Sequence, residues 1–90
     1  MSEYAVPRAG TIAAEQSKTF DRGFTSLIID NSNTSSGNVT VAYYRNGTAT
    51  GESYTIEPGK NRTWGAGNIM WDQFIATCAA STTAFYEYLP

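Results

Sequence analysis

The chain has 90 residues, enough for one domain, and such a domain buries only about two-thirds of the surface that its unfolded chain exposes. Charged residues make up 16% of the sequence, the formal net charge is −2, and the six Lys and Arg residues are scattered. This distribution lacks the basic stripe of a nucleic-acid-binding protein. No apolar run approaches the ~20 residues of a membrane-spanning helix, so neither nucleic acid nor a membrane is an expected partner.

The first residues, Met1-Ser2-Glu3-Tyr4, lack the basic and apolar regions of a signal peptide. The single cysteine, Cys78, excludes an internal disulfide. We therefore expect a chain that is made and folded in a cytoplasm.

Residues 1–22 differ from the remainder because they contain few large apolar side chains. We interpret this segment as an extended N-terminal arm, with one short strand near residues 17–20. The alternative is a disordered terminus. On this reading the chain consists of an arm, residues 1–22, and a β-sandwich domain, residues 23–90.

From Phe24 onward, short stretches rich in β-branched and aromatic residues alternate with turn sequences. The polar stretch 31–37 is a loop, and Asn46-Gly47 is a strong hairpin signal because both central residues of a type I′ turn need positive φ. Glu57-Pro58-Gly59-Lys60 is typical of a tight turn. The expected strands are residues 24–30, 38–45, 51–57, 62–64, 69–78 and 84–89.

This regular spacing predicts an all-β fold, a small antiparallel β-sandwich or jelly-roll-like barrel of about six to eight strands. Helix formation is not favoured, since the chain holds only Leu27 and Leu89 as leucines and is rich in Thr, Ser, Asn and Gly.

The sequence offers few groups for catalysis. Histidine is absent, which removes the commonest general base and metal ligand, and a lone cysteine forms neither a thiol dyad nor a zinc site. Asp72, beside Trp71 and Phe74, is a candidate for a raised pKa, but a solvent-facing strand position is the simpler interpretation. We therefore expect the protein to have no enzymatic activity, to bind no cofactor and to contain no metal site.

Aromatic residues are more informative. Tyr43 and Tyr44 are adjacent, as are Phe85 and Tyr86, so in a strand one member of each pair points away from the core. Low charge and surplus aromatics are typical either of a protein interface or of a platform on which sugar rings stack. The candidate interface residues are Tyr4, Val6, Pro7, Tyr44, Trp64, Trp71, Tyr86 and Tyr88.

The stretch from Phe24 to Tyr88 resembles the small β-sandwich virion proteins of tailed bacteriophages, of the capsid decoration, fibre or tail-accessory type. The likeness lies in Ile29-Asp30-Asn31, the Tyr43-Tyr44 strand, Ile56-Glu57-Pro58-Gly59 and a final strand after Ser81-Thr82-Thr83. The resemblance implies a non-enzymatic virion component, folded in the bacterial cytoplasm and assembled as a homo-oligomer, often a trimer.

The leading hypothesis is therefore a capsid decoration or cement protein whose partner is the major capsid protein or another virion protein. Its β-sandwich would sit on the assembled shell while the arm straps a neighbour. The alternative is a carbohydrate-binding module or a receptor-binding fibre or tail protein. A small hydrolase that uses Asp72 and a Glu is the third class.

Overall fold

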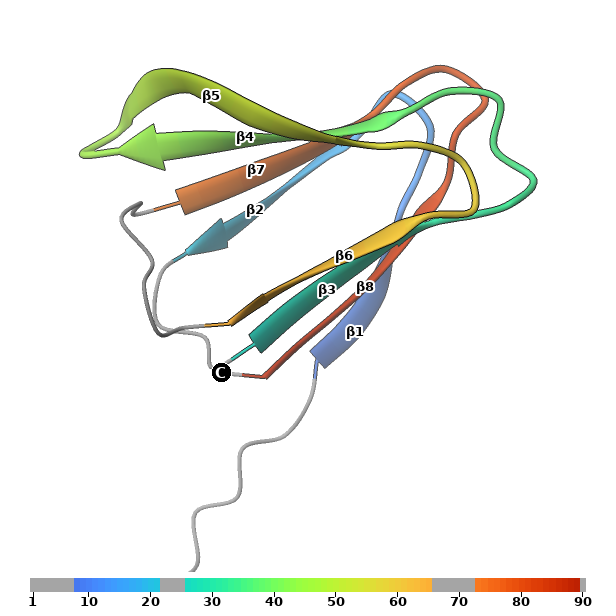
Figure 1. Ribbon diagram of the computed structural model, residues 1–90, viewed down its shortest axis with the longest axis horizontal. Coiled ribbons are helices and arrows are strands. Elements are labelled where there is room, and N and C mark those ends of the chain that lie inside the picture. The colour runs from blue at the N-terminus through green and yellow to red at the C-terminus, as the bar shows by residue number, and fades with distance from the viewer. Residues whose placement is uncertain (1–7, 22–25, 66–72, 90) are drawn as a thin grey trace, which may run out of the picture.

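The computed structural model describes residues 8–21, 26–65 and 73–89, and all regular secondary structure among these residues is β-strand (Figure 1). The strands are β1 (Arg8–Ile12), β2 (Ser17–Asp21), β3 (Ser26–Asn31), β4 (Val39–Arg45), β5 (Thr48–Ile56), β6 (Asn61–Gly65), β7 (Gln73–Cys78) and β8 (Ala84–Leu89). Within this part of the chain, no helix is long and apolar enough to cross a membrane.

The strands form two four-stranded antiparallel sheets, in the orders β1-β8-β3-β6 and β2-β7-β4-β5. Consecutive strands alternate between the sheets except for β4 and β5, which form a hairpin within one sheet. Figure 1 shows the two sheets stacked as layers. This is the eight-stranded arrangement of a jelly roll, and it confirms the predicted all-β sandwich or jelly-roll-like fold.

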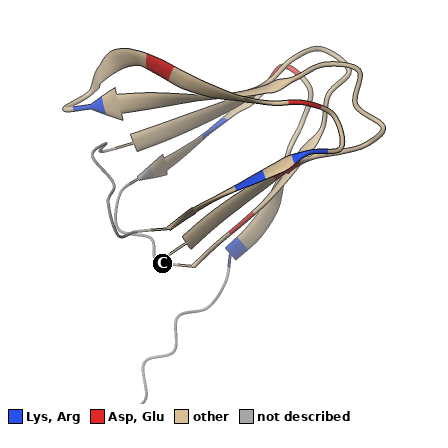
Figure 2. Cartoon of the chain, viewed as in Figure 1, with Lys and Arg blue, Asp and Glu red and all other residues tan. Residues whose placement is uncertain are grey.

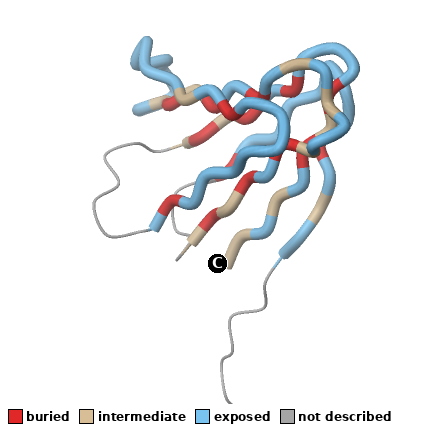
Figure 3. The backbone as a smooth tube through the Cα atoms, turned by 45° about the vertical axis from the view of Figure 1, so that its right-hand side comes forward, coloured by how far each residue is buried: buried red, intermediate tan, exposed pale blue. Residues whose placement is uncertain are grey.

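Buried and exposed side chains alternate along the strands, so one face of each sheet packs against the core. In β3, Leu27, Ile29 and Asn31 are buried while Asp30 is exposed, which is the period-two pattern of a sheet with one face against a core. Figure 3 shows buried positions recurring along the strands of both layers. The core consists of Ile12, Phe20, Leu27, Ile29, Val39, Val41, Tyr43, Ile56, Trp64, Phe74, Ala76, Cys78 and Ala84.

The Asn46-Gly47 turn is confirmed. Both residues have positive φ, 53° and 76°, and the flanking residues Arg45 and Thr48 pair across β4 and β5. Backbone twist of this kind matches the right-handed twist of the two strands, which is why this dipeptide favours a hairpin.

The N-terminal segment differs from the extended arm predicted for residues 1–22. Residues 8–12 form β1, which pairs with β8, and residues 17–21 form β2, which pairs with β7. The physical reason is that Ile12 and Phe20 each bury all but 3% of their surface in the core. Residues 8–21 therefore belong to the sandwich, and residues 1–7 and 22 of the predicted arm lie outside the described residues.

Candidate binding surfaces

The predicted interface residues do not gather on one surface. Among those that the structure describes, Trp64 lies in the core, Tyr86 and Tyr88 pack inward, and only Tyr44 is on an outer face. Tyr4, Val6, Pro7 and Trp71 lie outside the described residues, as does Asp72.

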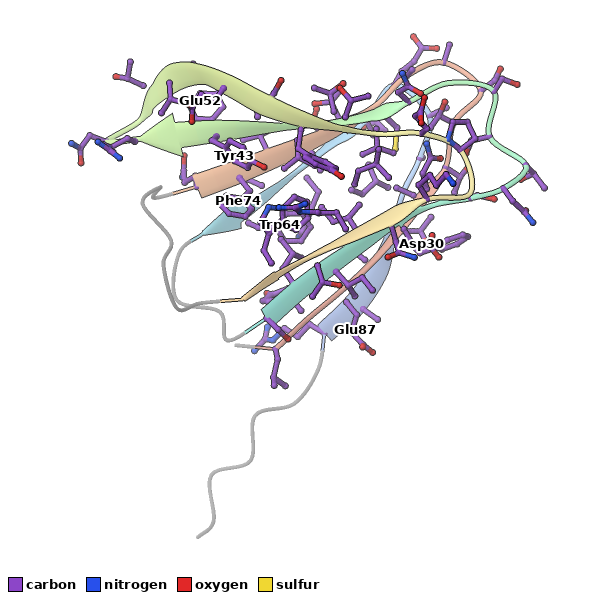
Figure 4. The ribbon with its side chains drawn as sticks, in the orientation of Figure 1. Asp30, Tyr43, Glu52, Trp64, Phe74 and Glu87 are labelled. Carbon is purple, nitrogen blue, oxygen red and sulfur yellow. The ribbon has the colours of Figure 1, made fainter. Side chains whose placement is uncertain are left out.

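Trp64 is 6% exposed, so its ring is not available to a partner or a sugar. Its indole Nε1 donates a hydrogen bond to the Tyr43 hydroxyl at 3.3 Å, and its ring meets that of Phe74 edge-on at a centroid distance of 5.5 Å. Figure 4 shows these three side chains between the two sheets. Trp64 therefore connects the layers and takes no part in the surfaces considered below.

Tyr86 and Tyr88 occupy the inward face of β8. Both rings contact Phe20 edge-on, with centroid distances of 5.0 and 5.8 Å, and both are half-buried. The ammonium of Lys18 lies 5.7 Å from the Tyr86 ring centroid, which adds a cation–π contact. These tyrosines extend the core more than they offer a surface.

Phe85 is the aromatic residue that β8 presents to solvent. It is 48% exposed, and it is the one large hydrophobic side chain counted as exposed among the described residues. The sequence predicts that Phe85 and Tyr86 point to opposite faces, but the prediction that Tyr86 is the surface residue is wrong. The neighbouring Glu87 indicates the correct face, because a carboxylate favours solvent and Phe85 lies on the same side of the strand as Glu87.

Phe85 belongs to a row of side chains that crosses three strands. Asp30 of β3 is paired directly with Phe85 of β8 and with Asn61 of β6. Directly opposed residues of antiparallel strands point to the same face, at Cβ separations of about 5 Å. All three side chains are exposed, so the row lies on the outer face of the β1-β8-β3-β6 sheet. Figure 4 shows Asp30 at this end of the sheet, well away from the core residues Trp64 and Phe74.

Two loops turn one end of this row into a pocket. The cavity has a volume of about 390 Å³ and lies where β3 runs into the loop of residues 32–38, beside the turn of residues 57–60. Every side chain on its wall is polar except that of Phe85. Its lining residues are Asp30, Asn31, Ser32, Asn33, Gly59, Asn61 and Phe85.

Asn31 fixes the loops that shape this pocket. The residue is fully buried, and its Nδ2 donates hydrogen bonds to the carbonyl oxygens of Gly37 at 3.0 Å and Ile56 at 2.9 Å. Its backbone carbonyl accepts a hydrogen bond from Gly59 N–H at 2.9 Å, and its own N–H donates to the carbonyl of Lys60 at 2.9 Å. One buried carboxamide and its peptide groups thus hold both pocket loops to the end of β3.

The outer face of the other sheet has a different character. One row of hydroxyl groups crosses all four strands of this sheet in register. From β2 through β7 and β4 to β5, the row consists of Ser17, Thr77, Thr40 and Thr55. The Ser17 and Thr77 hydroxyl oxygens lie 2.7 Å apart, within hydrogen-bonding distance.

The next row along this face consists of Thr19, Ile75, Ala42 and Ser53, and neither row contains a charge. Figure 2 shows β7 and the body of β4 free of Lys, Arg, Asp and Glu. We call these eight residues the hydroxyl face.

Cys78 is the single cysteine of the chain. It is a free thiol, 1% exposed, whose Sγ lies 3.5 Å from the carbonyl oxygen of Ile12. Burial raises the pKa of this thiol, and a hydrogen bond with the backbone of Ala84 partly offsets that rise. Within the described residues, no three His, Cys, Asp or Glu side chains come together in a way that could hold a metal ion.

Comparisons with known proteins bear on the fold. No protein-family model and no curated protein matches the sequence. The fold is similar to a de novo designed double-stranded β-helix, with a TM-score of 0.55 and 9% identity over 93% of this chain and 96% of that one. It is also similar to the crystal structure of PirA, with a TM-score of 0.58 and 17% identity over 100% of this chain and 96% of that one.

A third solved structure is that of Bacillus endospore appendages, described as disulfide-linked pili, with a TM-score of 0.46 and 19% identity over 99% of this chain and 88% of that one. The first two comparisons show that this chain has the fold of small all-β proteins of the double-stranded β-helix type.

Proposed function

We propose that this protein is a non-enzymatic structural protein of a phage virion, a capsid decoration protein that binds the assembled shell. The resemblance of residues 24–88 to small virion proteins of tailed bacteriophages is one support. The jelly-roll fold is a second, because viral capsid domains use this architecture repeatedly, although lectins and cupins use it as well.

The observation that carries the proposal is the hydroxyl face. Protein interfaces are depleted of charge at their centre, and this face presents two uncharged rows across four strands. Tyr44 borders it, paired with Gln73 of β7 and Ala49 of β5, and tyrosine is enriched at interfaces. We therefore assign the hydroxyl face to the contact with the major capsid protein.

We assign to residues 1–7 the role of a strap, meaning a segment that binds a neighbouring subunit of the shell. The sequence alone suggested that the whole of 1–22 extends to a neighbouring subunit, but residues 8–21 are built into both sheets. A strap formed by residues 1–7 would add a second contact to each copy, and linked contacts raise the effective concentration of the second site. A homo-oligomer, with the trimer preferred, would multiply these contacts again.

Density-gradient fractionation of particles from cells that carry the gene tests the proposal. We expect the protein to band with the particles in many copies, as measured by mass spectrometry, and the isolated protein to have a trimer's mass by light scattering. If the protein stays at the top of the gradient while the major capsid protein bands below, the proposal is wrong.

A further inference from the structure

We propose that the pocket between Phe85 and the loops of residues 32–38 and 57–60 is a binding site for a neutral sugar in its pyranose form. The inference goes beyond the proposed virion role and does not depend on it, because it rests on a different face of the molecule. Its basis is one exposed aromatic ring set directly beside a carboxylate and carboxamides.

Phe85 supplies the aromatic ring at this site. A single exposed hydrophobic side chain on a protein surface is ordinary and needs no explanation. This one, however, lies in register with Asp30 and lines a cavity whose other walls are polar. A pyranose ring has a face of C–H groups that stacks on an aromatic ring, while the edge of the sugar carries hydroxyls. A sugar that stacks on the exposed ring of Phe85, at the edge of the pocket, would direct its hydroxyls toward the polar groups beside that ring.

The polar side chains that line the cavity include those of Asp30, Asn33 and Asn61. A carboxylate accepts hydrogen bonds only, whereas a carboxamide both donates and accepts. Sugar hydroxyls do both, so each of these groups can pair with a hydroxyl. The cavity has a volume of about 390 Å³ and is open to solvent, so a bound sugar would be covered on one side only.

The negative charge of Asp30 determines which class of sugar the pocket should prefer. Among the described residues that line the pocket, Asp30 is the one ionisable residue, and none is a Lys or Arg that could pair with an anion. An acidic sugar would place its carboxylate near that of Asp30, and like charges at close range repel. The site is therefore expected to prefer neutral hexoses over sialic acid or uronic acids.

The pocket is also held in shape before any ligand arrives. The hydrogen bonds of Asn31 tie both loops to β3. Gly59 has a φ of +78°, a backbone conformation that residues other than glycine rarely adopt. A site that is already ordered loses less conformational entropy on binding. Even so, a ligand of about a dozen heavy atoms reaches a Kd only on the order of millimolar.

The test is an NMR titration of the full ¹⁵N-labelled chain with methyl α-D-glucopyranoside, methyl α-D-galactopyranoside and methyl α-D-mannopyranoside, and with N-acetylneuraminic acid as the anionic probe. We expect at least one neutral glycoside to shift the amide signals of residues 30–33, 59–61 and 85, with the hydroxyl face unaffected. No shift with any neutral glycoside at about 100 mM, far above a millimolar Kd, would overturn the proposal. Stronger binding of N-acetylneuraminic acid would overturn it too.

Matched variants assign the contact. Phe85→Ala should weaken binding about fivefold, which corresponds to about 1 kcal/mol, and Phe85→Tyr should restore it. Thr63→Ala, on the same outer face but outside the pocket, should leave the Kd unchanged. If Phe85→Ala keeps a native spectrum and full affinity, the site is not this pocket. Particle binding is measured separately through the hydroxyl face, so failure of either proposal is distinguishable from failure of the other.

Discussion

Trp64 of β6 and Tyr43 of β4 meet between the two sheets, where the indole Nε1 donates a hydrogen bond to the tyrosine hydroxyl at 3.3 Å. Each residue belongs to a different sheet, so this bond joins the layers through two otherwise apolar side chains. The Phe74 ring contacts both aromatic rings edge-on, with centroid distances of 5.1 Å to Tyr43 and 5.5 Å to Trp64. Such a cluster fixes the relative position of the sheets and thereby of both outer faces.

Removing the Tyr43 hydroxyl should therefore lower stability. Tyr43→Phe leaves the ring in place but takes away the acceptor for Trp64, which we expect to cost about 1 kcal/mol in the free energy of unfolding. Tyr44→Phe is the matched control, because its half-buried side chain lies on the outer face, and it should change stability by less than about 0.5 kcal/mol. Urea denaturation of both variants measures the difference. Equal effects would show that the bond between the sheets contributes nothing.

Gly10 of β1 should not tolerate a side chain. A Cβ built there would lie 2.6 Å from Cζ of Tyr86, the residue paired with it in β8. Gly10→Ala should therefore displace the half-buried Tyr86 ring from its contact with Phe20 and lower the free energy of unfolding by about 1 kcal/mol. Gly65→Ala is the control, since a Cβ at Gly65 would meet nothing within 4 Å. Thermal melts followed by circular dichroism compare the two, and an unchanged melting temperature for Gly10→Ala would contradict the packing of β1 on β8.

The Cys78 thiol should be unreactive in the native protein. Burial holds its pKa above the ordinary value of 9.0, so the thiolate is suppressed both by that shift and by lack of access. Because the folded state holds this proton more tightly than the unfolded state, the group stabilises the fold fully below pH 9 and loses that contribution as pH rises through its raised pKa. Labelling with a thiol reagent at pH 8, with and without urea, should show modification only on unfolding. Rapid labelling of the native protein would contradict the burial of Cys78.

Truncation separates the strap from the sandwich. Deleting residues 1–7 should leave the melting temperature unchanged and weaken particle binding, whereas deleting residues 1–21 should prevent folding. The longer deletion removes an edge strand from each sheet together with the buried side chains of Ile12 and Phe20. Circular dichroism and co-sedimentation of the shorter variant measure both effects. Full particle affinity without residues 1–7 would reject the strap while leaving the hydroxyl face as the contact.

Much of this fold follows from local sequence. The Asn46-Gly47 hairpin and the alternation of Val39, Val41 and Tyr43 are dictated by positive φ and by the two-residue period of a strand, both of which are visible in a few residues. Strand β1 was harder to predict, because Arg8–Ile12 holds one large apolar residue and acquires its place by pairing with β8, far along the chain.

The candidate sites depended more heavily on long-range structure. The pocket combines Asp30, Gly59 and Phe85 from three separate segments, and only the sheet order makes them neighbours. The hydroxyl face likewise emerges when Ser17, Thr40, Thr55 and Thr77 fall into register across four strands. Trp64 was assigned to the surface because an isolated tryptophan in a five-residue strand gives no indication of which face is buried.

Co-sedimentation of purified protein with particles lacking it tests the central claim, that the hydroxyl face binds the shell, most directly. Thr40→Glu places a charge at the centre of that face, and Thr63→Glu places the same charge on the outer face of the other sheet. Both positions are exposed, so both variants should fold. The account predicts that Thr40→Glu abolishes binding while Thr63→Glu binds like the wild type. Undiminished binding of Thr40→Glu, or equal loss in the two variants, would contradict it.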